Sequence, residues 1–111
     1  MPARGEIWLA DFNPTRGHEQ AGTRPALVVS ADAFNNGPAG LVVVLPLTTR
    51  ERQVPLRVAV EPPMGGLRER SFILCEMIRS ISTDRLIRRL GAVDGATMRT
   101  VEDRLRILQD L

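Results

Sequence analysis

The sequence predicts a mainly β (α+β) fold, a small and partly open β-barrel of about five strands with short helices and a C-terminal helix. Short runs rich in Val, Leu and Ile, separated by segments that contain Gly and Pro, fill the first two-thirds of the chain. Apolar residues then recur at helical spacing near the C-terminus. Because 111 residues suit one hydrophobic core, we expect residues 1–111 to form a single domain.

Five apolar segments are predicted as strands, since each is short and bounded by turn-forming residues. The third is almost entirely Val and Leu, whereas the fourth alternates and carries Arg57 among apolar neighbours. Three polar loops, residues 14–23, 35–40 and 61–66, separate the strands. The predicted strands are residues 7–12, 26–30, 41–47, 54–60 and 72–81.

Two helices are predicted after the last strand. Ser82-Thr83-Asp84 can cap a short helix that carries Leu86 and Leu90 and ends at Gly91. Asp94 can cap a second helix, in which Glu102 and Arg106 are spaced to form a supporting ion pair. We expect the apolar stripe of this helix to cover the core or a subunit interface; it consists of Met98, Val101, Leu105 and Leu108.

The charge of the chain permits nucleic-acid binding but does not by itself predict it. The formal net charge is +2, and all 15 basic residues are arginines because the sequence contains no lysine. Arginine stays protonated far above neutral pH, so the pI of about 9.9 exaggerates the basicity. Only clustering of the arginines would indicate a binding surface.

The sequence also bears on location and redox chemistry. No apolar run approaches the roughly 18 residues of a membrane span, and residues 1–6 lack the apolar stretch of a signal peptide. We therefore expect a cytoplasmic protein. The single cysteine, Cys75, excludes an intramolecular disulfide, and its apolar neighbours predict a buried and unreactive thiol.

Common catalytic patterns are missing from the sequence. It contains no glycine-rich phosphate loop, no zinc-ligand spacing and no nucleophile elbow, and three Phe and one Trp are too few for an RNA-recognition sheet. The polar segment of residues 17–25 places His18, Glu19, Gln20 and Arg24 close together. Such a loop can form a binding site on a β scaffold, although alone it is more typical of a solvated connection.

Several blocks of the sequence resemble the MazF/PemK family of toxins, which are endoribonucleases of type II toxin–antitoxin systems. The first blocks surround the polar loop, the next lies at the end of the third predicted strand, and the last covers the fifth strand and the residues after it. Together they span nearly the whole chain. These blocks are residues 4–8, 11–14, 17–25, 27–30, 44–49, 55, 71–81, 84–86 and 91.

The resemblance implies an SH3-like barrel and a homodimer that cleaves single-stranded RNA, including mRNA, at specific sequences, which inhibits translation and growth. It implies no metal and no cofactor. Attack by the RNA 2′-hydroxyl would leave a 2′,3′-cyclic phosphate and a 5′-hydroxyl. The expected partner is a cognate antitoxin whose acidic tail, disordered when free, covers the RNA groove.

The family's catalytic arginine, in a Gly-x-Arg-Pro turn, corresponds to Arg24, and its catalytic threonine to Thr48. This chain departs from the family in having Met77 where glutamine is frequent, and His18 where another polar residue is common. We interpret His18 as an RNA contact, with a role as acid or base as the alternative. The predicted RNA-binding residues are Asn13, His18, Glu19, Gln20, Asn35, Thr49, Glu76 and Arg79.

Other interpretations remain open at this stage. Arg24 could pair with Glu19, Thr48 could be an ordinary strand residue, and Glu76 with Arg79 could form a structural pair. The main alternative function is that of a gyrase-poisoning toxin, which has the same fold but no nuclease activity. The fold alone does not separate the two, because function depends on the residues of the site. A non-catalytic nucleic-acid-binding barrel is a further alternative, to which the modest charge and the few aromatic residues lend little support.

Overall fold

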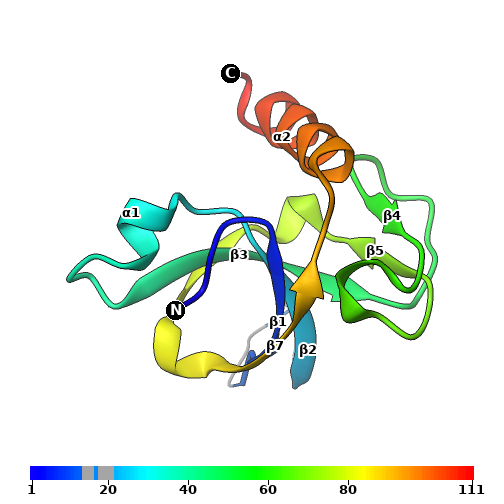
Figure 1. The fold of residues 1–111 in the computed structure, drawn as a ribbon. Helices are drawn as coiled ribbons and strands as arrows, with labels where there is room; N and C mark the ends of the chain where they lie inside the picture. Colours follow the sequence, from blue (N-terminus) through cyan, green and yellow to red (C-terminus); the bar gives the residue numbers. More distant parts are fainter. Residues whose placement is uncertain (14–16, 18–21) are drawn as a thin grey trace.

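The structure is a computed structural model that describes residues 1–13, 17 and 22–111 (Figure 1). The described residues form seven strands, a C-terminal helix and several short helices, which confirms the mainly β class. The helical elements are α1 (Asp32–Asn35), α2 (Gly95–Gln109), η1 (Met64–Gly66), η2 (Cys75–Met77) and η3 (Thr83–Arg85). The strands are β1 (Glu6–Asp11), β2 (Thr23–Val28), β3 (Leu41–Thr48), β4 (Val58–Val60), β5 (Ser71–Ile73), β6 (Arg79–Ser82) and β7 (Leu86–Ala92).

The sheet curls into a partly open barrel, as predicted. Its antiparallel order is β4-β5-β3-β2-β1-β7, and β6 pairs with the first half of β3. In the chain, β6 and β7 are separated only by η3 (Figure 1). Strand β6 lies at the β3 edge of the sheet, and β7 lies at the β1 edge. Because the connection between them is so short, the sheet has to curl until these two edges come close together.

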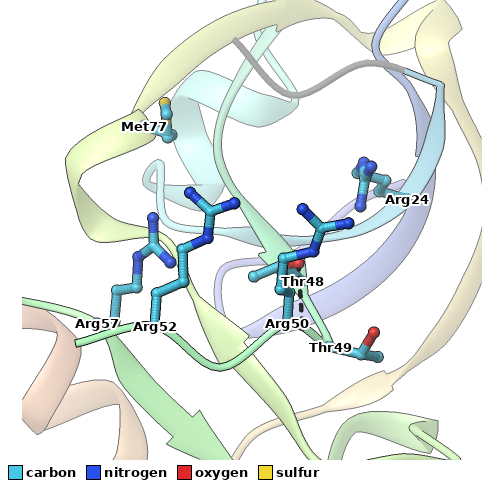
Figure 2. Close-up of a pocket in the computed structure, with 7 residues that line it drawn as sticks. All are labelled: Arg24, Thr48, Thr49, Arg50, Arg52, Arg57 and Met77. Atoms are coloured by element: carbon cyan, nitrogen blue, oxygen red, sulfur yellow. Dashed lines mark hydrogen bonds between the residues drawn. The ribbon is translucent and has the colours of Figure 1, made fainter. Parts of the chain in front are cut away.

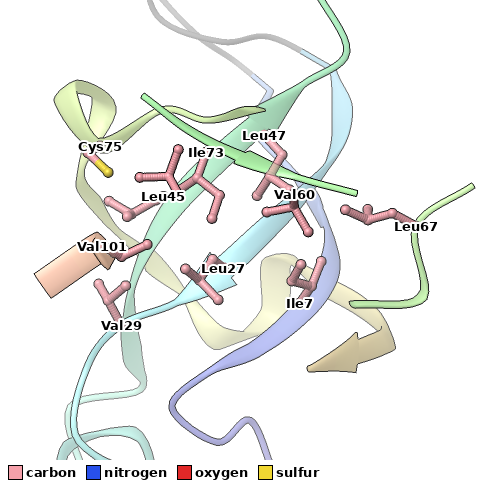
Figure 3. Packing of buried hydrophobic residues seen from close by; sticks show 11 residues of the cluster. Ile7, Leu27, Val29, Leu45, Leu47, Val60, Leu67, Ile73, Cys75 and Val101 are labelled. Atoms are coloured by element: carbon pink, nitrogen blue, oxygen red, sulfur yellow. The ribbon is translucent and has the colours of Figure 1, made fainter. Parts of the chain in front are cut away.

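Strands β1, β2 and β3 are buried on both faces. Ile7, Leu27 and Leu45 point into the main core, and Figure 3 shows them packed with residues of β4, β5 and α2. Ala26 and Val44 point to the opposite face, into a second core that surrounds Phe12 and Ile81. Alternate residues of a strand point to opposite faces, so two cores require apolar side chains at successive positions. This explains the nearly continuous apolar run of β3.

Helix α2 begins as the sequence predicts. The Asp94 carboxylate accepts a hydrogen bond from the Thr97 N–H at 2.8 Å, which is an N-terminal cap. Val101 is fully buried and Met98 and Leu105 pack against the main core, whereas Leu108 is exposed. The predicted pair of Glu102 with Arg106 is wrong. Glu102 instead binds Arg4, near the N-terminus, at 2.5 Å, because the chain start lies within reach of this face of the helix.

The helix predicted over Leu86 and Leu90 is wrong, since these residues lie in strand β7. Only Thr83–Arg85 is helical, and its cap is the Ser82 hydroxyl, which accepts from the Asp84 N–H. Leu86 pairs with Ala10 and Gly91 with Ile7 across an antiparallel ladder. The apolar spacing in this segment fits a helix and a bulged strand equally well, and pairing with β1 selects the strand.

Two predicted strands are shorter than expected. Strand β4 covers only Val58–Val60 of residues 54–60, and residues 72–81 are divided into β5, η2 and β6. The division has a cause in β3, which pairs with β6 before Pro46 and with β5 after it. Proline has no N–H to donate to a ladder, so pairing breaks there, and only the Pro46 carbonyl accepts a bond, from Leu74 N–H at 2.9 Å.

Candidate active site

A pocket of about 390 Å³ opens where β2 begins and β3 ends (Figure 2). Among the residues that the structure describes, its lining is strongly cationic, because four of them are arginines and Met77 is the only apolar one. Such clustering favours an anionic ligand. The lining residues are Arg24, Thr48, Thr49, Arg50, Arg52, Arg57 and Met77.

Arg24 and Thr48 reach this pocket from adjacent strands. The β2–β3 ladder ends at the pair of Ala26 with Pro46, and Arg24 and Thr48 each lie two residues beyond that pair on their own strand. Residues two apart on a strand share a face, and both side chains therefore lie on the same face as Ala26. The arrangement brings a permanently charged guanidinium and a hydroxyl to one point, as a phosphate group would require.

The segment after Thr48 directs further arginines to the pocket. The Arg50 N–H donates to Thr48 Oγ1 at 3.2 Å, which tightens the chain just after β3. On the outside, Glu51 lies 3.4 Å from Arg70 Nη1, and the Arg70 guanidinium sits 5.1 Å from the centre of the Phe72 ring. Glu51 is thus paired with Arg70 outside the pocket, whereas its two neighbours, Arg50 and Arg52, extend into the pocket (Figure 2).

Arg57 also lines the pocket, and its guanidinium group forms an ion pair with the carboxylate of Glu76. Glu76 Oε2 accepts from Arg57 Nε at 2.9 Å and lies 2.7 Å from Nη2. Both side chains are largely buried, with 12% of Arg57 and 21% of Glu76 exposed. Glu76 thus contributes to the pocket through Arg57, and it is not among the lining residues.

The structure brings some of the predicted residues together and separates others. Arg24, Thr48 and Thr49 line the pocket. Arg79 pairs with Val44, which places it on the sheet face that carries Arg24, with its guanidinium 5.6 Å from the centre of the Phe12 ring. The suggested structural pair of Glu76 with Arg79 is replaced by the pair of Glu76 with Arg57.

Asn13 and Asn35 have positions suited to holding loops. Asn13 Oδ1 accepts from the Gly22 N–H at 3.0 Å and so joins the two ends of the β1–β2 connection. Asn35 is buried in α1, away from the pocket lining, and its amide donates to the Ser30 carbonyl at 3.0 Å. Its burial argues against contact with RNA.

The remaining predicted residues, His18, Glu19 and Gln20, lie outside the described residues. Reasoning from the sequence missed Arg50, Arg52 and Arg57 as site residues. The first two had a visible signal, since Arg50-Glu51-Arg52 directly follows the motif that contains Thr48. Arg57 had a weaker one, a charged residue among apolar neighbours.

Other kinds of site find little support in the part of the chain that the structure describes. It holds no group of three or more His, Cys, Asp or Glu side chains placed to bind a metal ion. None of its helices is long and apolar enough to cross a membrane. Burial, with a contribution from the neighbouring Glu76, raises the pKa of the Cys75 thiol to about 11, so the thiol stays protonated and unreactive at neutral pH.

Comparison with known proteins gives a consistent result. Residues 3–109 match the family described as PemK-like, MazF-like toxin of type II toxin-antitoxin system. Endoribonuclease MazF9 of Mycobacterium tuberculosis is 37% identical over 116 residues, covering 100% of this chain and 98% of that protein. Endoribonuclease EndoA of Bacillus subtilis is 32% identical over 105 residues, covering 94% and 90% respectively.

Solved structures agree with this relationship. The fold matches MazF from Deinococcus radiodurans with a TM-score of 0.86 and 30% identity, covering 99% of this chain and 97% of the other. It also matches an endoribonuclease from a mycobacterial species, solved in complex with its cognate antitoxin, with a TM-score of 0.81 and 30% identity. That match covers 100% of this chain and 97% of the other.

Proposed function

Because the chain belongs to the PemK-like, MazF-like toxins of type II toxin-antitoxin systems, we propose that it is an endoribonuclease toxin that cuts single-stranded RNA. One observation carries the assignment of the active site. Arg24 and Thr48, the residues that the family resemblance marks as catalytic, line one pocket, and the described part of its lining includes Arg50, Arg52 and Arg57 as well. Cleavage of mRNA would inhibit translation and growth.

The proposed chemistry uses a nucleophile that RNA itself supplies, the 2′-hydroxyl next to the scissile phosphate. In-line attack builds negative charge on the phosphate oxygens and expels the 5′-oxygen. The products are then a 2′,3′-cyclic phosphate and a 5′-hydroxyl. The protein has to orient the strand and stabilise charge, and neither task requires a metal ion or another cofactor.

Arg24 and Thr48 suit these two tasks. The guanidinium of Arg24 offers several fixed N–H donors and a permanent positive charge to the developing negative charge. It is a poor general base, because it does not lose its proton near neutral pH, but it can donate to the leaving 5′-oxygen. Thr48 Oγ1 accepts from the Arg50 N–H, which leaves the hydroxyl hydrogen to donate to a phosphate oxygen.

The pocket lining supports RNA as the substrate class. Arg24, Arg50, Arg52 and Arg57 concentrate positive charge that the small net charge of +2 does not reveal. We propose that Thr49 and Arg79 contact the RNA as well, together with His18, Glu19 and Gln20 from the loop before Arg24. Asn13 would act by joining the ends of that loop.

Three further features belong to the proposal. The protein would act as a homodimer, would be located in the cytoplasm and would be inhibited by a cognate antitoxin with an acidic tail that is disordered when free. A related mycobacterial endoribonuclease has been solved with its cognate antitoxin, which supports a partner of this kind. The similarity to named endoribonucleases favours nuclease activity over gyrase poisoning.

The decisive experiment incubates the purified protein with a long, unstructured RNA in the presence of a chelator. Discrete cuts whose 5′ ends can be phosphorylated directly by polynucleotide kinase are expected, because the proposed chemistry leaves 5′-hydroxyls. Mapping those ends also yields the cleavage motif. Intact RNA would refute the nuclease, and an accompanying inhibition of gyrase would favour the gyrase-poisoning alternative.

A further inference from the structure

Arg57 is held in one orientation at the edge of the pocket. Its Nε and Nη2 atoms lie 2.9 and 2.7 Å from the same Glu76 oxygen, Oε2, and only 12% of its side chain is exposed. Two donors that converge on one acceptor restrict rotation of the guanidinium group. Within the described residues, Nη1 has no hydrogen-bond partner, so the edge formed by Nη1 and the second N–H of Nη2 is available to a ligand.

The backbone before Arg57 is held as well. Leu56 has a φ of 75°, in the left-handed region that residues other than glycine seldom adopt. Its side chain packs against the main core, so this packing outweighs the strain of the turn. A turn anchored by Leu56 and a guanidinium bound by Glu76 together fix the position at which Arg57 meets a ligand.

Building on the proposed ribonuclease function, we infer that Arg57 binds a second phosphate group of the RNA strand and that Glu76 is its positioning residue. In Figure 2, Arg57 and Arg52 lie at the Met77 end of the pocket, whereas Arg24 lies at the opposite end. A phosphate bound by Arg57 is therefore a different one from the phosphate cleaved at Arg24. The strand would be held at two points, which aligns the scissile phosphate for in-line attack.

A phosphate fits this end of the pocket better than a base does. The free edge of Arg57 presents two parallel N–H groups, which match two oxygens of a phosphate. The described part of the pocket lining contains no aromatic side chain on which a base could stack, and its only apolar residue is Met77. Within the described residues, the four guanidinium groups of the lining and the one carboxylate that binds Arg57 also favour the charged backbone of RNA.

The test has to avoid leaving a buried charge behind. Glu76 Oε1 is buried without a hydrogen-bond partner among the described residues, so loss of Arg57 alone would leave this carboxylate unpaired. The variant of choice is therefore Arg57→Gln combined with Glu76→Gln, which keeps the net charge constant. A matched control is Arg104→Gln with Asp103→Asn, which removes a 2.7 Å ion pair of α2 outside the pocket lining.

Binding is measured with a 2′-O-methylated single strand that carries a mapped cleavage site, because this probe cannot be cut. The association constant is followed between about 50 and 200 mM salt. Each phosphate contact to a single strand contributes about 0.7 to the slope of log K against log salt concentration, so the double variant should lose about 0.7. The α2 control should keep the wild-type slope.

The positioning role of Glu76 has its own readout. Glu76→Gln alone should raise KM for RNA cleavage several-fold with little change in kcat, and Glu76→Asp, which keeps the carboxylate, should recover part of that loss. Arg57→Lys should retain most of the salt dependence, because it keeps the charge, while it binds more weakly.

An unchanged slope in the Arg57/Glu76 double variant would overturn the second phosphate contact. A changed set of cleaved sites with an unchanged slope would overturn it too, in favour of base reading by Arg57. A wild-type KM in Glu76→Gln, or equal KM values in Glu76→Gln and Glu76→Asp, would remove the positioning role. A wild-type protein that leaves RNA uncut would instead refute the proposed function, so the two failures are distinguishable.

Discussion

Arg24 on β2 and Thr48 on β3 line the same pocket, each two positions beyond the pair of Ala26 with Pro46 that ends the antiparallel β2–β3 ladder. Their separation along the chain is large, yet the register of one ladder brings both to the same sheet face. The barrel thus supplies a rigid frame for the two groups that the proposed cleavage requires.

Replacing Arg24 or Thr48 with alanine should abolish most of the cleavage and preserve the fold. Loss of one charge-stabilising donor typically lowers a rate by about 10²–10³, and Arg24→Ala should lie at the upper end. Single-turnover cleavage of a defined RNA measures the loss, and circular dichroism with thermal unfolding serves as the control. A folded Arg24→Ala protein that cuts at the wild-type rate would contradict the assignment.

His18 should affect binding of RNA and not proton transfer. His18→Ala is expected to weaken RNA binding and to leave the shape of the pH–rate profile unchanged, because the proposed chemistry relies on Arg24 and Thr48. The profile is measured in single turnovers at saturating RNA. Loss of one limb of the profile together with a large fall in rate would show that His18 transfers a proton.

The antitoxin tail and RNA should compete for one groove in a dimer. The cationic pocket lining is complementary to an acidic tail as well as to a phosphate backbone, so binding of the two is expected to be mutually exclusive. Light scattering should give the mass of a dimer at micromolar concentration. A monomer would remove the dimeric groove, and a ternary complex with uncut RNA still in the active site would disprove competition.

The contact between η1 and β7 should tolerate no side chain at Gly66. A Cβ atom there would lie 2.0 Å from the Leu90 carbonyl oxygen, whereas at Gly40, with a similar positive φ, it would meet nothing within 4 Å. Gly40→Ala should therefore cost only the roughly 1–2 kcal/mol of a left-handed alanine. Gly66→Ala should cost about 1–3 kcal/mol more, since backbone has to move.

Urea unfolding at one protein concentration measures both losses. Equal losses in the Gly66 and Gly40 variants would show that β7 does not approach η1 as closely as the structure describes.

The sequence alone was sufficient for the parts of the fold that depend on local signals. Helix α2 was predicted from the Asp94 cap and the spacing of Met98, Val101 and Leu105, all within a few turns of one another. The core of β3 was predicted from its apolar run. Arg24 and Thr48 were identified from a family resemblance in their surrounding motifs, which made no use of the distance between them.

Only the tertiary structure decided the features that depend on distant residues. Leu86 and Leu90 lie in a strand because β1 is available to pair with it, and residues 72–81 are interrupted because β3 carries Pro46. The carboxylate of Glu76 meets Arg57, 19 residues away, and not Arg79.

The convergence of Arg24, Arg50, Arg52 and Arg57 on one pocket likewise arises from pairing across β2 and β3 and from the turn at Leu56. The physical reason is the range of the interactions. Caps and helical spacing act over a few residues and are visible in the sequence, whereas strand register and ion pairs join residues that only the folded chain brings together.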